Sequence, residues 1–161
     1  MKNLNFKNLR IVNPRDGWPN QDVISTAAGA DDVITNTKVF DNVSEACNDL
    51  NYLFASSARK RDLNIKTLNL VNTVSSLNKT DFCRNDFKFG ILFGCESSGL
   101  SNEDLITANQ LIYIPSNSDF SSLNISHAVS LICWEFFKFF NDLILDQNSK
   151  ISLNTSPTIK D

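Results

Sequence analysis

Three short segments of this sequence combine small, polar and charged residues in a way that could bind a ligand and act on it. They are residues 56–61 (Ser-Ser-Ala-Arg-Lys-Arg), 94–100 (Gly-Cys-Glu-Ser-Ser-Gly-Leu) and 121–124 (Ser-Ser-Leu-Asn). Glycines and serines let a ligand approach the backbone closely, arginines hold phosphate groups, and a carboxylate accepts hydrogen bonds. A structural interpretation stays open for each segment: a solvated basic loop, a tight strand–helix connection, and a helix cap made by Ser122.

The sequence gives little sign of other chemistry. The single histidine, His127, follows an apolar helix start, and we expect it in the core or in an interface. The cysteines have no Cys-x-x-Cys spacing, which predicts no metal site and favours buried thiols in a reducing compartment. No run reaches the roughly 18 apolar residues of a membrane span. Residues 1–6 lack the apolar core of a signal peptide, so we expect a cytoplasmic protein.

Length, composition and charge restrict the number of domains and the kind of ligand that the chain can bind. The chain has 161 residues, of which 42% are hydrophobic, and this is enough for one globular domain with a buried core. The formal net charge is −3, so the chain is not a strongly basic nucleic-acid binder. Contact with a nucleic acid would need a local basic patch, and residues 59–61 are the candidate.

Hydrophobic patterning and turn residues predict an alternation of strands and helices. Strands are expected at residues 9–12, 51–55, 89–94 and 111–114, with short extended pieces at 33–34 and 38–40. Helices are expected at residues 20–28, 42–50, 68–77, 101–109 and 123–145, the fourth opened by a capping box of Ser101 and Asp104. The alternation indicates an α/β fold, a mostly parallel sheet with helices on both faces. Ligands in such sheets bind at the carboxyl ends of strands, where the three polar segments begin.

The last predicted helix differs from the others in its composition. Residues 123–145 are apolar nearly all round, whereas a surface helix would show a single stripe. We therefore expect this helix to be buried on one side by the domain core and on the other by a second subunit. Residues 146–161 are polar and are expected to form a flexible tail after a domain of residues 1–145.

Taken together and in order, these segments resemble a known family. Residues 56–61, 91–103 and 114–129 look like the SpoU/TrmH branch of the SPOUT superfamily of RNA ribose methyltransferases. Residues 9–15 and 29–32 are similar to the TrmJ-like tRNA methyltransferases within that branch. The resemblance covers roughly residues 1–140.

The resemblance implies a fold, a reaction and a site. The fold would be an α/β domain with a C-terminal trefoil knot, dimeric through its long C-terminal helix. The reaction would transfer a methyl group from S-adenosyl-L-methionine (SAM) to a ribose 2′-hydroxyl of RNA, tRNA rather than rRNA. The residues that would bind the cofactor are Ser56, Ser57, Ala58, Gly94, Ile114, Ser121, Ser122 and Leu123. RNA binding would fall to Arg59, Lys60 and Arg61, and catalysis to Arg59, Glu96, Ser122 and Asn124.

One part of the family pattern has no counterpart in this sequence. The family begins with a strand and an Asn-x-Gly-x-x-x-Arg motif, placed just before the segment that matches residues 1–6, and this sequence starts at Met1. We therefore expect the methyltransferase domain to be incomplete at its N-terminus. Two alternatives stay open. One is a catalytically incompetent relative that binds cofactor or RNA, or pairs with an intact subunit. The other is an unrelated function on the same fold.

Overall fold

The computed structural model describes residues 1–58, 63–119 and 121–154, with side chains as far as residue 145. Its strands are β1 (Arg10–Val12), β2 (Lys38–Phe40), β3 (Tyr52–Ser56), β4 (Thr67–Asn69), β5 (Phe89–Leu92) and β6 (Gln110–Tyr113). The 3₁₀ helix η1 (Lys2–Leu4) opens the chain. The α-helices are α1 (Gln21–Thr26), α2 (Asp31–Thr35), α3 (Val43–Cys47), α4 (Leu70–Ser75), α5 (Lys79–Phe82), α6 (Asn102–Ile106) and α7 (Ile125–Asn154). The α/β fold is as predicted.

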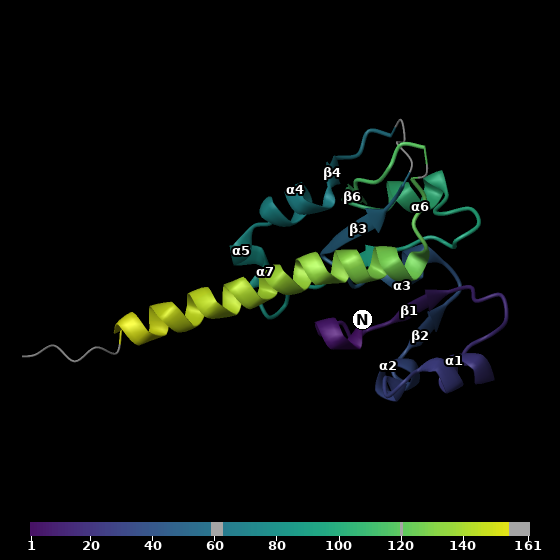
Figure 1. Cartoon of the computed structure of the whole chain (residues 1–161), viewed down its shortest axis with the longest axis horizontal. Helices are drawn as coiled ribbons and strands as arrows, with labels where there is room; N and C mark the ends of the chain where they lie inside the picture. Colours follow the sequence, from purple (N-terminus) through teal and green to yellow (C-terminus); the bar gives the residue numbers. More distant parts are fainter. Residues whose placement is uncertain (59–62, 120, 155–161) are drawn as a thin grey trace, which may run out of the picture.

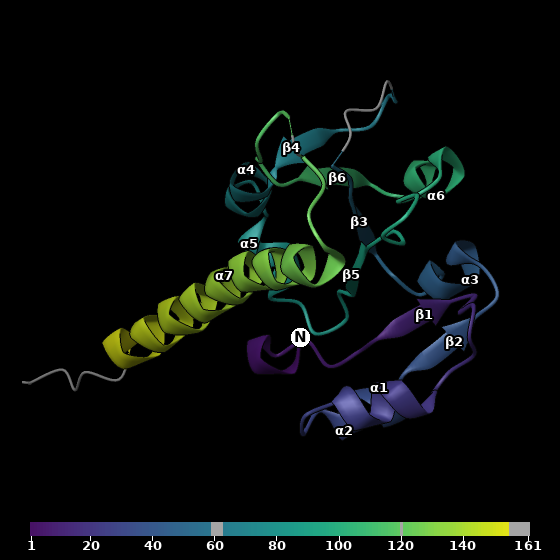
Figure 2. The same cartoon turned by 45° about the vertical axis from the view of Figure 1, so that its right-hand side comes forward.

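The strands form two parallel sheets. The larger sheet has the order β4-β6-β3-β5, and β1 pairs with β2 in the smaller one. Within the larger sheet Phe54 of β3 is in register with Ile91 of β5 on one side and with Gln110 of β6 on the other. Figures 1 and 2 show the smaller sheet, with α1 and α2, to one side of the larger sheet. All strands of the larger sheet are parallel, so their carboxyl ends share one edge.

Hydrophobic clusters cover both faces of the larger sheet. Along β3, Leu53 and Ala55 point to one face and pack with a cluster that includes Leu105 of α6. Phe54 points to the opposite face, as the two-residue period of a strand requires, and packs against Phe136 of α7. Leu70 of α4 belongs to this second cluster. Helices therefore lie on both faces, and the strand ends between them remain free to carry a site.

Helix α7 is longer than predicted. It runs over Ile125–Asn154, so it passes the predicted end at residue 145 and takes in residues 146–154 of the expected tail. These residues contain no glycine or proline, so nothing in their sequence stops a helix. The C-terminal half of α7 extends away from the rest of the fold (Figure 1). Residues 155–161 lie outside the described part of the chain.

Two shorter segments also depart from the predictions, whereas a third feature agrees with them. Residues 33–34 were expected to be extended but lie in α2, whose first turn holds two acidic residues that favour a helix N-terminus. The helix expected at residues 68–77 begins only at Leu70, because β4 occupies Thr67–Asn69 and the Asn69 side chain caps α4. The predicted capping box is confirmed: Asp104 N donates to Ser101 Oγ and Ser101 N donates to the Asp104 carboxylate, each at 3.0 Å.

The isolated chain differs from two expectations about single residues. His127 is exposed on α7, so it does not lie in the core, and its expected place in an interface stays a prediction. Of the cysteines expected to be buried, Cys133 is buried and Cys47 half-buried, whereas Cys83 and Cys95 are exposed. In the described part of the chain no helix has the length and apolar character needed to cross a membrane.

Candidate functional site

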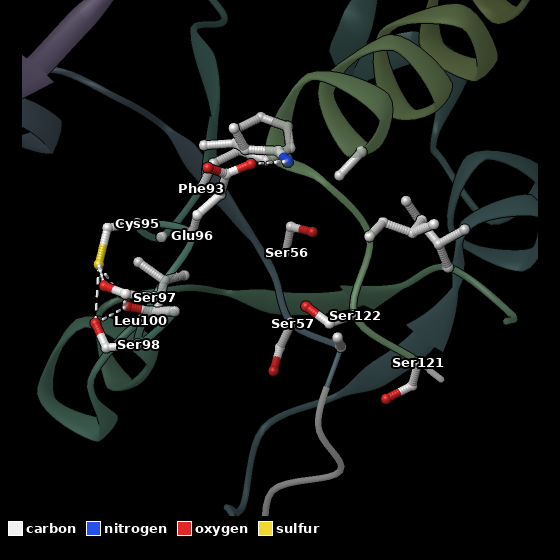
Figure 3. A pocket seen from close by; sticks show the side chains of 17 residues that line it. Ser56, Ser57, Phe93, Cys95, Glu96, Ser97, Ser98, Leu100, Ser121 and Ser122 are labelled. Carbon is white, nitrogen blue, oxygen red and sulfur yellow. Dashed lines mark hydrogen bonds between the residues drawn. The ribbon is translucent and has the colours of Figure 1, made fainter. Parts of the chain in front are cut away.

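A cavity of about 190 Å³ lies where the loops after β3, β5 and β6 converge. Its lining consists of Ser56, Ser57, Ala58, Phe93, Gly94, Cys95, Glu96, Ser97, Ser98, Gly99, Leu100, Ile114, Ser121, Ser122, Leu123, Ile125 and Ala128. In Figure 3 the loop with Cys95 lies on the left, Ser121 and Ser122 on the right, and Ser56 and Ser57 between them. The structure thus places the cavity at the carboxyl edge of a parallel sheet, where ligands bind in such folds.

The three loops that the sequence singled out come together in this cavity. All eight residues to which cofactor binding was assigned line it: Ser56, Ser57, Ala58, Gly94, Ile114, Ser121, Ser122 and Leu123. Of the predicted catalytic residues, Glu96 and Ser122 line the cavity, and Asn124 is hydrogen-bonded to Glu96. Arg59, Lys60 and Arg61 lie outside the described residues.

The backbone of the sheet fixes the floor of the cavity. Ser56 is the last residue of β3, and Ser57 N donates to the carbonyl oxygen of Ile112 in β6 at 3.0 Å. This bond continues the pairing of the two central strands by one residue into the loop. Ile114 follows β6 directly and lines the cavity beside it. Residues of different strands are therefore held at the cavity by sheet geometry.

The loop after β5 is closed tightly on itself. Gly99 N donates to the carbonyl oxygen of Cys95 at 2.8 Å, and Gly99 has a φ of +71°, where side chains are rarely tolerated. A Cβ atom on Gly94 would lie 2.7 Å from Gly99 Cα, and still closer to the Gly99 carbonyl carbon and Leu100 N. Gly94 is therefore needed for the loop to pack against itself. From the sequence alone, Gly94 was interpreted as room for the close approach of a ligand.

Glu96 links the loop after β5 to the start of α7. Asn124 Nδ2 donates to Glu96 Oε1 at 2.5 Å, and Ile125 N donates to the same oxygen at 3.4 Å. Asn124 Oδ1 accepts a hydrogen bond from Ser126 N at 2.9 Å, which caps the helix. The predicted cap was Ser122, which instead lines the cavity. Glu96 and Asn124 hold two walls of the cavity together.

Cys95 is an exposed thiol at the cavity wall that the sequence did not mark as functional. Its Sγ lies 2.8 Å from Ser98 Oγ and 3.7 Å from Ser97 Oγ. The hydrogen bond with Ser98, strengthened by the backbone of the same residue, lowers the pKa of Cys95 to about 7. A thiol with that pKa is substantially ionised at neutral pH, and the thiolate is the reactive form.

Other lining residues were also missed by the sequence interpretation. They are Phe93, Ser97, Ser98, Gly99, Leu100, Ile125 and Ala128. Residues 97–100 lie in a segment that was singled out only as a whole, and Phe93 was assigned to a buried strand. Ile125 and Ala128 could have been found from their spacing, because residues three apart share a helix face.

The fold and the cavity define an α/β protein with a cavity at the carboxyl edge of a parallel sheet. The chain belongs to the SpoU rRNA Methylase family, which matches it over residues 1–134. This confirms the family resemblance drawn from the residues of the three loops.

Individual relatives agree with this assignment. The chain is 31% identical over 154 residues to an uncharacterized tRNA/rRNA methyltransferase of Haemophilus influenzae, covering 96% of this chain and 60% of that protein. It is 31% identical to the tRNA (cytidine-2′-O-)-methyltransferase TrmJ of Methanocaldococcus jannaschii, covering 93% of this chain and 64% of that protein. The chain thus spans less than two thirds of the length of these curated relatives.

Solved structures show the same fold. The crystal structure of TrmJ from Z. mobilis ZM4 has a TM-score of 0.75 and 32% identity, with 99% of this chain and 63% of that chain covered. The structure of a probable methylase family protein from Haemophilus influenzae has a TM-score of 0.80 and 28% identity, with 98% of this chain and 63% of that chain covered.

Proposed function

We propose that this chain transfers the methyl group of SAM to a ribose 2′-hydroxyl of tRNA, in the cytoplasm. One observation carries the proposal: eight residues from three separated segments, assigned to the cofactor by the family resemblance, line a single cavity. Relatives named as tRNA 2′-O-methyltransferases, at 31% to 33% identity, support tRNA over rRNA as the substrate.

The lining is chemically suited to SAM. Ala58, Phe93, Leu100, Ile114 and Leu123 supply apolar surface for an adenine ring, and the serines supply hydroxyls for a ribose and an amino-acid moiety. The cavity volume is about 190 Å³, below the roughly 300–1,000 Å³ of pockets that enclose drug-sized ligands. A ligand as large as SAM would therefore extend through the open side, where the RNA has to approach.

Methyl transfer from SAM requires two contributions from the protein. Bound SAM supplies a methyl group on a positively charged sulfur, which is already a good leaving group. The chain has to hold the acceptor hydroxyl in line with that methyl group and allow its proton to leave. We assign Ser122 and Asn124 to positioning the acceptor nucleotide. Glu96 keeps Asn124 in place through their 2.5 Å hydrogen bond. Arg59, Lys60 and Arg61 are assigned to the phosphate and ribose groups of the RNA.

We also propose a homodimer through α7. One side of this helix packs into the core through Ile132, Phe136 and Phe139. Another side leaves Leu131, Trp134, Ile144 and Leu145 exposed by 44%, 48%, 55% and 63%. Large apolar residues exposed along one helix are typical of a subunit interface. A second copy of the same face would bury them.

We propose further that the C-terminal segment forms the trefoil knot of the SPOUT fold. The strand order supports this, because β6 inserts between β3 and β4 after β5 has taken the other side of β3. From β6 the chain then returns to the loop after β5, where Asn124 meets Glu96. Such a path crosses earlier segments of the chain, which ordinary connections avoid.

The direct test is methyl transfer from SAM carrying a labelled methyl group to unfractionated tRNA and, separately, to rRNA. We expect label in tRNA, and after nuclease digestion in a 2′-O-methylnucleoside. The matched control is tRNA already methylated at the target position, which should accept no label. A folded chain that binds SAM but labels neither RNA would contradict the catalytic proposal and favour a non-catalytic relative.

A further inference from the structure

The described part of the cavity lining carries charge of one sign, which is negative. Among the lining residues that the structure describes, Glu96 is the one carboxylate, and none carries a cationic side chain. The same set contains a single aromatic ring, that of Phe93. Aromatic faces and carboxylates both attract cations, and an aromatic face does so most strongly where water is excluded.

The ring of Phe93 is held in place by the protein core. Phe93 is half-buried and packs against the cluster that contains Phe54 and Phe136. It follows β5 by one residue, so the sheet fixes its backbone. In Figure 3 Phe93 and Glu96 lie toward the same end of the cavity, next to the first turn of α7. A ring fixed in this way binds a cation without first losing conformational freedom.

Glu96 also determines how the start of α7 affects the cavity. The N-terminal end of a helix carries a partial positive charge, and Ile125 of α7 lines the cavity. Left alone, this end would repel a cationic ligand. Glu96 Oε1 accepts hydrogen bonds from Ile125 N and from Asn124 Nδ2, which places a full negative charge against it. The described wall at this end is therefore net negative.

We infer that the cavity selects the sulfonium cation of SAM over the neutral thioether of S-adenosylhomocysteine, and that Phe93 and Glu96 supply this selectivity. The inference rests on the proposed function and extends it to the order of ligand exchange. During transfer the S–CH₃ bond breaks and its electron pair stays on sulfur. An O–CH₃ bond forms at the 2′-oxygen, and the hydroxyl proton leaves to solvent. The positive charge on sulfur is lost in the same step, so the product loses the attraction that held the substrate.

The experiment is isothermal titration calorimetry of the full chain with SAM and with S-adenosylhomocysteine in the same buffer. Both ligands share the adenosine and amino-acid groups, so the ratio of their Kd values isolates the sulfonium. We expect the unsubstituted chain to bind SAM about fivefold more tightly or better. Phe93→Leu and Glu96→Gln should each lower that preference by about half or more, through weaker SAM binding.

Phe140→Leu is the matched control, because Phe140 packs against the same cluster as Phe93 but does not line the cavity. It should leave the ratio unchanged. Glu96 is exposed, so Glu96→Gln tests the inference even where Phe93→Leu fails to fold. Equal affinities in the unsubstituted chain, or a preference that survives both substitutions, would overturn the inference. Binding of neither ligand to the folded chain would overturn the proposed function itself.

Discussion

Gly94 shows how a single residue shapes the cavity. The space for its Cβ is already filled by the backbone of Gly99 and Leu100. Any side chain at this position must push the loop after β5 away from the strand that carries it. Since Glu96 and Cys95 lie in that loop, the wall of the cavity would move with it.

Gly94→Ala is therefore expected to weaken SAM binding by roughly tenfold or more. Gly17→Ala is the control, because Gly17 has a φ of +75° but nothing within 4 Å of a built Cβ and does not line the cavity. It should lower stability by about 1 kcal/mol through backbone strain and leave the Kd unchanged. Equal SAM affinity in Gly94→Ala and the unsubstituted chain would show that the loop is not part of the site.

Cys95 gives a prediction about pH. Its hydrogen bond with Ser98 lowers its pKa to about 7, so the thiolate fraction rises as pH increases through 7. The rate of alkylation by iodoacetamide, followed by peptide mass spectrometry, should therefore reach half its maximum near pH 7. Ser98→Ala should move this midpoint toward the ordinary value for a thiol, about 8.5. A midpoint that stays the same in Ser98→Ala would contradict the assigned cause.

Among the elements, the long buried strands and the loops after them were easier to predict than the short strands and the limits of helices. The apolar run before Gly94 and the small residues after it mark a buried strand and its loop, because few other arrangements suit such a sequence. The start of α4 was missed because Thr67, Leu68 and Asn69 pair with β6, and this pairing depends on residues more than 40 positions away. Such long-range pairing overrides local propensity.

For the cavity, too, features set by local sequence could be predicted, whereas contacts between distant segments could not. Its loops could be named from composition, and the cavity brings all three together. The capping role of Asn124 could not be separated from that of Ser122, because both are good cap residues near the start of the same helix. The contact between Asn124 and Glu96 joins residues 28 positions apart and follows only from the fold.

Asp49 connects the smaller sheet to the larger one. Its carboxylate accepts hydrogen bonds from Arg10 of β1 and from Lys88, which precedes β5. The Arg10 guanidinium, followed by Lys88, holds the pKa of Asp49 well below its usual range. A carboxylate with a lowered pKa stabilises the fold above its unfolded pKa, near 3.9, and this contribution is lost as pH falls below that value.

Asp49→Asn should therefore reduce the free energy of unfolding at pH 7, by less than about 1 kcal/mol because the pair is largely solvated. The difference from the unsubstituted chain should shrink as pH falls from about 5 toward 2. Chemical denaturation followed by circular dichroism measures both. Asp86→Asn, which removes a surface pair with Arg84 within one loop, is the control and should change little. A difference that persists at low pH would contradict the account.

At the scale of the whole molecule, the composition of α7 points beyond a single chain. The sequence predicted a helix buried on two sides, and one of those sides is exposed in the isolated chain. Trp134 lies near the middle of the exposed side and stacks on Phe137, with ring centroids 6.0 Å apart.

Trp134→Glu is expected to convert a dimer to a monomer in sedimentation velocity, because a buried, unpaired carboxylate is costly at an apolar interface. Ile106→Glu is the matched control, since Ile106 is 64% exposed on α6 and should leave the dimer intact. An unsubstituted chain that sediments as a monomer at high concentration would rule out the proposed interface.

In the proposed function, the loops after β3, β5 and β6 form a binding site for SAM. Equilibrium dialysis of labelled SAM against the purified chain tests it most directly, with Ala58→Leu as the variant because Ala58 lines the cavity and is exposed to it. We expect one saturable SAM site per chain, which the larger side chain removes while the thermal unfolding temperature stays close to that of the unsubstituted chain. A folded chain that binds no SAM, or binding that Ala58→Leu leaves intact, would contradict it.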